Sequence, residues 1–233
     1  MLTAVAFVPT PPLLVPELAG ASAPDTEELR QACLHAVQLL AQVSRTWMAI
    51  GTHSSERTLG PRTRGSWRAF GADVTVSLGP DAVTRPEPEL PLPGLVAGWL
   101  REQVDPEAAL RLRLYSACTS PDRCRQLGRA LADDSGAQAL LVLGDGCTTL
   151  TEKAPGAWDE RGAAVQRQID QALSTVDSAT LGALDAQLSA ELGVSGRVPW
   201  QVAAHAVGEG WRGRSLYRGA PFGVGYDVAI WQR

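Results

Sequence analysis

Three short apolar runs, each cut off by proline, glycine or polar residues, constrain the fold of this chain more than any other feature. They are residues 2–8, 46–51 and 139–143. Apolar runs of this length with such boundaries are typical of strands buried on both faces of a sheet. A sheet buried on both faces needs helices above and below it, so the runs favour an α/β architecture.

The segments between these runs supply the helices. Helices are predicted from Asp25, at about 94–104, at about 121–134, and over much of 159–208, and further strands at 73–78, 110–117, 214–218 and 224–231. The Pro-rich stretch 79–93 is predicted to be a surface loop rather than a linker, because a helix resumes directly after it. We therefore expect one domain over residues 1–233, an α/β fold with a three-layer, largely parallel central sheet flanked by helices.

Composition excludes several classes of partner. The 21 basic and 25 acidic residues give a net charge of −4 without long runs of one sign, so neither nucleic acid nor a membrane surface is expected as a partner. No apolar run approaches the ~20 residues of a membrane span, and the N-terminus does not resemble a signal peptide. The four scattered cysteines fit reduced thiols. These features predict a cytoplasmic protein whose partner is a small molecule or another protein.

Three segments at predicted strand ends carry motifs. They are Pro9-Thr-Pro-Pro-Leu-Leu-Val-Pro-Glu17, Ile50-Gly-Thr-His53 and Gly144-Asp-Gly-Cys-Thr-Thr-Leu-Thr151. In order and spacing they resemble the LigB-type, class III extradiol ring-cleavage dioxygenases. That family shows Pro-His-Pro-Pro-Leu after its first strand, a histidine after its second, and Gly-Asp-x-Ser-His-x-Leu further on. The resemblance implies the LigB-like fold and, because family members often pair, a homodimer.

The resemblance also identifies which positions would carry the chemistry. Family members hold Fe(II) with two histidines and one carboxylate, and a further histidine acts as acid and base. Here Thr10 stands at the first ligand position, His53 is retained at the second, and Thr148 replaces the acid/base histidine. The segment matching the acidic ligand, residues 195–200, contains no carboxylate. Only one of three metal ligands therefore remains.

Other residues keep alternatives open. Asp145, Glu17 and Glu56 are candidate replacement ligands that could join His53, although Asp145 also suits a turn-capping role. Cys147, which follows a strand end, is a candidate nucleophile, although it also suits a small packing residue. His35 is expected to be solvated.

Our leading hypothesis is a diverged, non-catalytic protein of the dioxygenase fold that keeps a cleft for a small molecule, such as an aromatic one, or for a protein, with no cofactor. The first alternative is an Fe(II)-dependent extradiol dioxygenase with unconventional ligands, and the second is a hydrolase or transferase centred on Cys147. Bound iron would favour the first alternative, and a selectively reactive thiol would favour the second.

Overall fold

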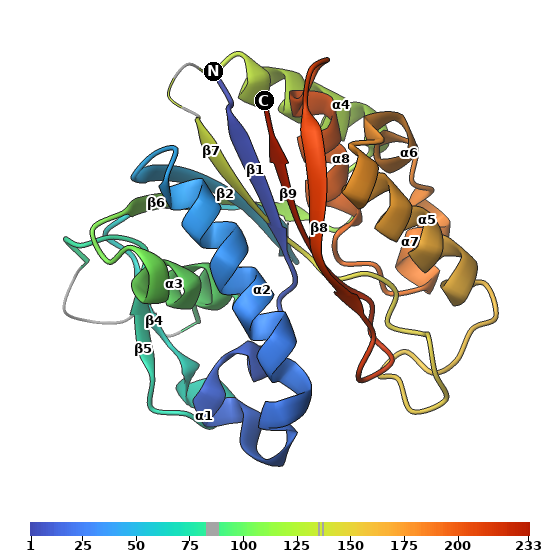
Figure 1. Ribbon diagram of the computed structural model, residues 1–233, viewed down its shortest axis with the longest axis horizontal. Coiled ribbons are helices and arrows are strands. Elements are labelled where there is room, and N and C mark those ends of the chain that lie inside the picture. The colour runs from blue at the N-terminus through green and yellow to red at the C-terminus, as the bar shows by residue number, and fades with distance from the viewer. Residues whose placement is uncertain (83–88, 135, 137) are drawn as a thin grey trace.

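The computed structural model describes residues 1–82, 89–134, 136 and 138–233, so part of the predicted Pro-rich loop lies outside the described residues. A seven-stranded sheet runs through the centre in the order β3-β6-β2-β7-β1-β9-β8 (Figure 1). Its strands are β1 (Ala4–Val8), β2 (Thr46–His53), β3 (Arg57–Leu59), β6 (Ala109–Ser116), β7 (Ala139–Leu143), β8 (Arg212–Gly219) and β9 (Tyr226–Gln232).

The four central strands β6, β2, β7 and β1 are parallel to one another. The strands outside them, β3 on one side and β9 and β8 on the other, pair antiparallel. Parallel neighbours bring their carboxyl ends to the same edge of the sheet, so the loops after β1, β2 and β7 gather there. The predicted α/β class is confirmed in the form of a large mixed sheet with a parallel centre.

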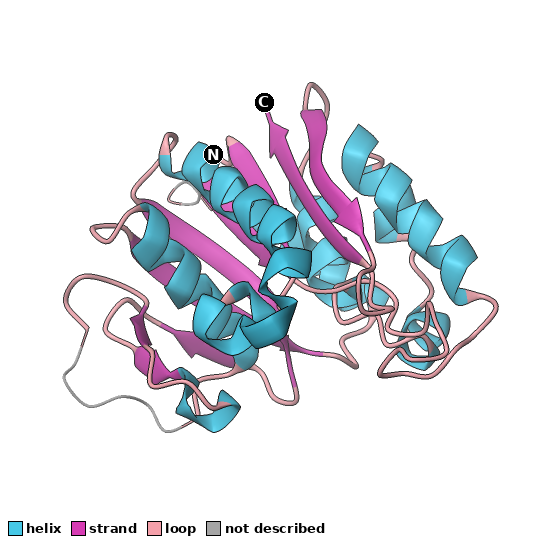
Figure 2. Cartoon of the chain, turned by 60° about the horizontal axis from the view of Figure 1, so that its bottom comes forward, coloured by secondary structure: helices cyan, strands magenta, loops and turns pink. Residues whose placement is uncertain are grey.

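Helices cover both faces of this sheet (Figure 2). Their bounds are α1 (Pro16–Ala19), α2 (Ala23–Ala41), α3 (Leu92–Val104), α4 (Pro121–Ala132), α5 (Gly162–Thr175), α6 (Ser178–Gly182), α7 (Ala186–Glu191) and α8 (Arg197–Ala206). Proline stands in the first turn of α2, α3 and α4, where its missing N–H costs no helical hydrogen bond. Among the described helices, none is long and apolar enough to cross a bilayer.

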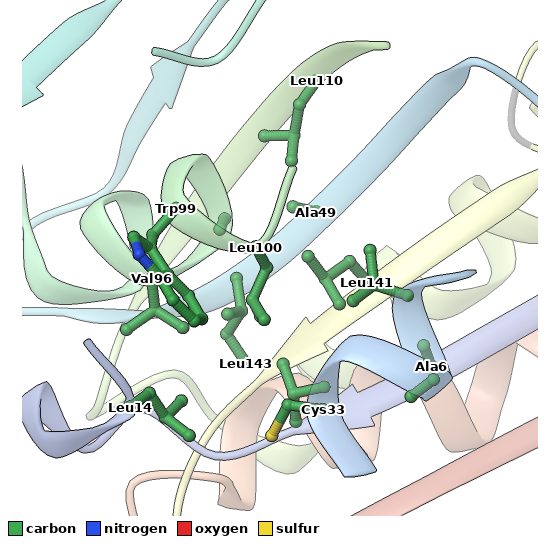
Figure 3. Close-up of a cluster of buried hydrophobic side chains, with 14 of the residues drawn as sticks. Ala6, Leu14, Cys33, Ala49, Val96, Trp99, Leu100, Leu110, Leu141 and Leu143 are labelled. Atoms are coloured by element: carbon green, nitrogen blue, oxygen red, sulfur yellow. The ribbon is translucent and has the colours of Figure 1, made fainter. Parts of the chain in front are cut away.

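Strand alternation divides the interior into two cores. In β1, Ala4, Ala6 and Val8 face the core that holds the α2 and α3 side chains, whereas Val5 and Phe7 face the core formed with α5 and α8. Figure 3 shows the first core, where Cys33 of α2 and Leu100 of α3 lie beside Leu141 and Leu143 of β7. Because both faces of the sheet are buried at β1 and β7, the sequence of each strand is a continuous apolar run.

Three parts of the fold differ from the sequence prediction. The predicted strand at 73–78 is the shorter β5 (Thr75–Ser77), which pairs with β4 (Arg64–Ser66) in a separate two-stranded sheet. Strand β3 was missed because three residues are too few to show a period. The predicted helical region 159–208 is four helices, with aspartate N-caps starting the two in the middle.

Candidate functional site

A pocket of about 220 Å³ lies at the carboxyl ends of β1, β2 and β7. It is lined by Thr10, Thr52, His53, Leu92, Pro93, Leu143, Gly144, Asp145 and Ser195. Three residues that the sequence singled out, Thr10, His53 and Asp145, therefore come together, whereas Thr148 does not line this pocket. The topology explains this, since each follows or ends a strand whose carboxyl end points to the same edge.

Asp145 is the polar centre of the pocket and is bound by Thr10. The backbone N–H of Thr10 donates to Oδ1 of Asp145 at 2.6 Å, and its hydroxyl Oγ1 donates to Oδ2 at 2.9 Å. Burial raises the pKa of the Asp145 carboxyl, while the hydrogen bonds from Thr10 and Ser195 act in the opposite direction. Thr10, itself buried, thus directs both of its donors to Asp145.

Ser195 joins the loop before α8 to the other strand ends. The backbone N–H of Asp145 donates to Ser195 Oγ at 2.9 Å, and the hydroxyl of Thr52 donates to the Ser195 carbonyl at 2.8 Å. Gly144 permits this approach, because a Cβ added there would lie 2.4 Å from the Cα of Gly196. No role was predicted for Ser195 or Thr52 from the sequence. The sequence feature that could have identified Ser195 as a site residue is its place in the segment that matches the family's acidic ligand.

His53 is the last residue of β2 and stands half-buried at the pocket wall. The N–H of Ser55 lies 3.3 Å from its Nδ1 and the hydroxyl of Ser54 lies 3.4 Å from the same atom. If Nδ1 accepts from Ser55, the neutral ring carries its proton on Nε2. Nε2 has no hydrogen-bond partner within the described part of the chain, so it remains available to a ligand.

The pocket holds one imidazole and one carboxylate, His53 and Asp145. Across the residues that the structure describes, no group of three or more His, Cys, Asp or Glu side chains could hold a metal ion. Glu17 is exposed on α1 and does not line the pocket. A two-histidine, one-carboxylate face for Fe(II) therefore does not fit the donors present here.

Thr148 lies outside the pocket lining. Its N–H donates to the carbonyl of Leu192 at 2.9 Å, and its hydroxyl lies 3.4 Å from the same oxygen. A Cβ on Gly193 would collide with the Thr148 hydroxyl, so this side chain packs against the turn after α7. Thr148 therefore contributes to packing in this structure, whereas the resemblance had given its position an acid/base role.

Cys147 is fully buried, and its backbone belongs to a polar network. Its N–H donates to Oε1 of Gln166 at 2.9 Å, and Gln166 Nε2 donates to the carboxylates of Asp170 (2.7 Å) and Asp227 (2.8 Å). Burial and the neighbouring Asp170 raise the pKa of the Cys147 thiol to about 12. Thiolate is therefore scarce at neutral pH, and Cys147 is a poor nucleophile.

His35 and Arg197 are also placed by the structure. His35 is exposed on α2, as expected. Arg197 begins α8 and is 4% exposed, with its guanidinium turned toward the backbone carbonyls of Ala117 and Thr119 after β6. Among the residues matching the family's acidic segment, Ser195 therefore reaches the pocket and Arg197 does not.

Comparison with known proteins shows a similarity of fold. No family model matches the chain, and no curated protein matches it. Among solved structures, the uncharacterized protein JW3007 from Escherichia coli K12 is similar to it, with a TM-score of 0.58 and 11% sequence identity. The match covers 99% of this chain and 100% of that chain, so the two share an architecture over their whole length. At this identity the likeness concerns the fold alone.

Proposed function

We propose that this protein is a diverged, non-catalytic member of the class III extradiol dioxygenase fold that binds a small molecule in the pocket of Thr10, His53 and Asp145. The observation that carries the proposal is the hydrogen-bonding of Thr10. At the position where the family carries a metal-ligating histidine, this chain has Thr10, whose side-chain hydroxyl and backbone N–H both donate to Asp145.

In this proposal, polar groups at positions that bind a metal in the family form hydrogen bonds with one another instead. Ser195, in the segment that matches the family's acidic ligand, accepts from the Asp145 N–H. His53 keeps its imidazole at the pocket wall, with Nε2 available for a ligand. Such a set suits recognition of a ligand's oxygen atoms more than redox chemistry at iron.

Size and lining restrict the ligand. The pocket's volume of about 220 Å³ is below the ~300–1,000 Å³ typical of sites for drug-sized ligands, so a molecule of one small ring fits better. Leu92, Pro93 and Leu143 supply an apolar wall, while His53 and Asp145 supply polar contacts. A small phenol or aromatic acid combines these two requirements.

Metal analysis is the first test of the proposal. Protein purified without chelators should contain well under one equivalent of iron, zinc or manganese, because two donors hold a divalent ion weakly. The parent should also give no yellow ring-opened product from catechol in air after addition of Fe(II). A stoichiometric metal that is lost in His53→Ala would instead support the iron-dependent alternative, for which the shared pocket of His53 and Asp145 is the favouring observation.

Ligand binding is the second test. Catechol and 4-hydroxybenzoate serve as probes in a titration of ¹⁵N-labelled protein followed by amide chemical shifts. We expect saturable shifts at Thr10, His53 and Asp145. The affinity obtained from them should be about tenfold weaker in His53→Ala. The matched control is His35→Ala, which removes an exposed imidazole from α2. Shifts spread evenly over the protein, or equal effects of both variants, would contradict a binding role for this pocket.

A further inference from the structure

A second hollow lies at the opposite end of the sheet from the pocket of His53. It is a groove of about 760 Å³ between the end of α2 and strands β8 and β9. Arg212, Arg214 and Arg233 line it together with Leu39 and Ile230. Gln232 of β9 pairs with Ala4 at the start of β1, whereas the His53 pocket lies beyond the end of β1. Figure 1 shows both chain termini at this end of the sheet.

The strand register places two of the arginines on one face. Arg212 is opposite Gln232 and Arg214 is opposite Ile230, so both project toward the α2 side of the sheet, where Ile230 is buried. Residues two apart on a strand are separated by roughly 6.6 Å, which lets two guanidinium groups converge on one anion. Arg233 extends the same basic rim past the end of β9.

The acidic residues that the structure describes do not pair with these arginines. None of the three forms an ion pair with any carboxylate of the described residues, although acidic side chains outnumber basic ones in this protein. Arg218, the next arginine along the same strand, behaves differently, since its Nε lies 3.6 Å from Asp170. Within the described part of the chain, the groove therefore holds three guanidinium groups without carboxylate partners, beside the apolar Leu39 and Ile230.

The shape of β8 favours a compact ligand over an added strand. β8 is the edge strand of the sheet, and its register with β9 shifts between Ser215 and Tyr217. Such an irregularity bends the strand and hinders pairing with an extended peptide. The guanidinium groups on its face are not affected by this irregularity and offer several donors to a multivalent anion.

We propose that this groove is a binding site for a small organic phosphate, with the phosphate between Arg212 and Arg214 and an apolar group on Leu39 and Ile230. Guanidinium forks match the geometry of phosphate oxygens and bind them in pairs. Because the site is open, binding is expected to be weak and to fall as ionic strength rises. This site is separate from the one proposed above and does not depend on it.

The test uses phenyl phosphate as the probe, with phenol and inorganic phosphate as partial probes. In low salt, titration of ¹⁵N-labelled protein with phenyl phosphate should give saturable shifts confined to residues 210–214 and 230–233. Each partial probe should bind at least threefold more weakly than phenyl phosphate. The double variant Arg212→Gln/Arg214→Gln should weaken binding of phenyl phosphate by about tenfold or more. Both side chains are exposed, so the variant should unfold at the same temperature as the parent.

Arg62→Gln is the matched control, because Arg62 is also exposed but lies in the loop before β4. It should bind phenyl phosphate as the parent does. The proposal is overturned if shifts do not saturate, if they map to the His53 pocket instead, or if Arg62→Gln weakens binding as much as the double variant. Stronger binding of phenol than of phenyl phosphate would likewise refute a phosphate site.

Discussion

Substituting asparagine for Asp227 tests the buried network beneath Cys147. Asp227 of β9 and Asp170 of α5 are 6% and 9% exposed, and Gln166 Nε2 donates to both. Burial, followed by the proximity of Asp170, raises the pKa of Asp227 from 3.8 to about 8, while Arg218 and Gln166 act in the opposite direction. At neutral pH the Asp227 carboxyl group therefore keeps its proton in the folded protein, whereas the unfolded chain would release it.

The raised pKa sets the direction of the pH effect on stability. Between pH 4 and pH 8 the folded protein binds a proton at Asp227 that the unfolded chain does not, so the free energy of unfolding falls as pH rises. One such proton gives a slope of at most about 1.4 kcal/mol per pH unit. Over the roughly four units from 3.8 to about 8, the upper bound is about 6 kcal/mol.

An asparagine side chain at this position would imitate the protonated carboxyl at every pH. Its amide oxygen accepts from Gln166 and its amide group donates to Asp170, so the network stays connected. We expect Asp227→Asn to be more stable than the parent at pH 8 by about 1–3 kcal/mol, and to flatten the fall in stability between pH 5 and pH 8.

Urea denaturation at pH 5, 6, 7 and 8 provides the measurement. Asp81→Asn is the control, because it removes an exposed carboxylate from a loop and should leave the pH slope unchanged. An Asp227→Asn variant that keeps the parent's slope and is less stable at pH 8 would refute the raised pKa of Asp227. A slope that flattens equally in Asp81→Asn would refute it as well.

Three further predictions concern close packing and thiol chemistry. Gly144→Ala should lower the free energy of unfolding, measured by urea denaturation, by about 1–3 kcal/mol, because its Cβ would strike the backbone before α8. Gly60→Ala is the control. No atom lies within 4 Å of a Cβ added there, so it should lower the free energy of unfolding by less than about 1 kcal/mol. Arg197→Met should lower the free energy of unfolding by about 2–4 kcal/mol, since two carbonyls after β6 would lose their guanidinium donor. Iodoacetamide should modify the exposed Cys118 in the folded protein and reach Cys147 only after unfolding, which mass spectrometry of the alkylated peptides would detect.

The central strands were predictable from the sequence, whereas the edges of the sheet were not. β1 and β7 are buried on both faces, and that environment produces an uninterrupted apolar run. β3 is three residues long and carries Arg57 and Thr58, so nothing in its composition distinguishes it from a loop. Its pairing with β6 depends on a neighbour more than fifty residues away, which local pattern does not encode.

The site was predictable to the extent that topology dictates it. Thr10, His53 and Asp145 meet because parallel strands share a carboxyl edge, and this follows from strand assignment alone. The hydrogen bonds between Thr10 and Asp145 depend on side-chain rotamers and could not be inferred. Thr148 was expected at the same place, but three residues beyond Asp145 the chain has already turned to pack against Leu192.

The position of β9 between β1 and β8 has a consequence for how the chain is made. Ala4 lies opposite Gln232, so β1 emerges early from the ribosome but meets this neighbour only when residues 226–232 have followed. During that interval one edge of an apolar strand stays open and can pair with another nascent chain. Completion of the sheet is therefore a late event in biosynthesis, and slow translation of the last third would lengthen the exposure to misassembly.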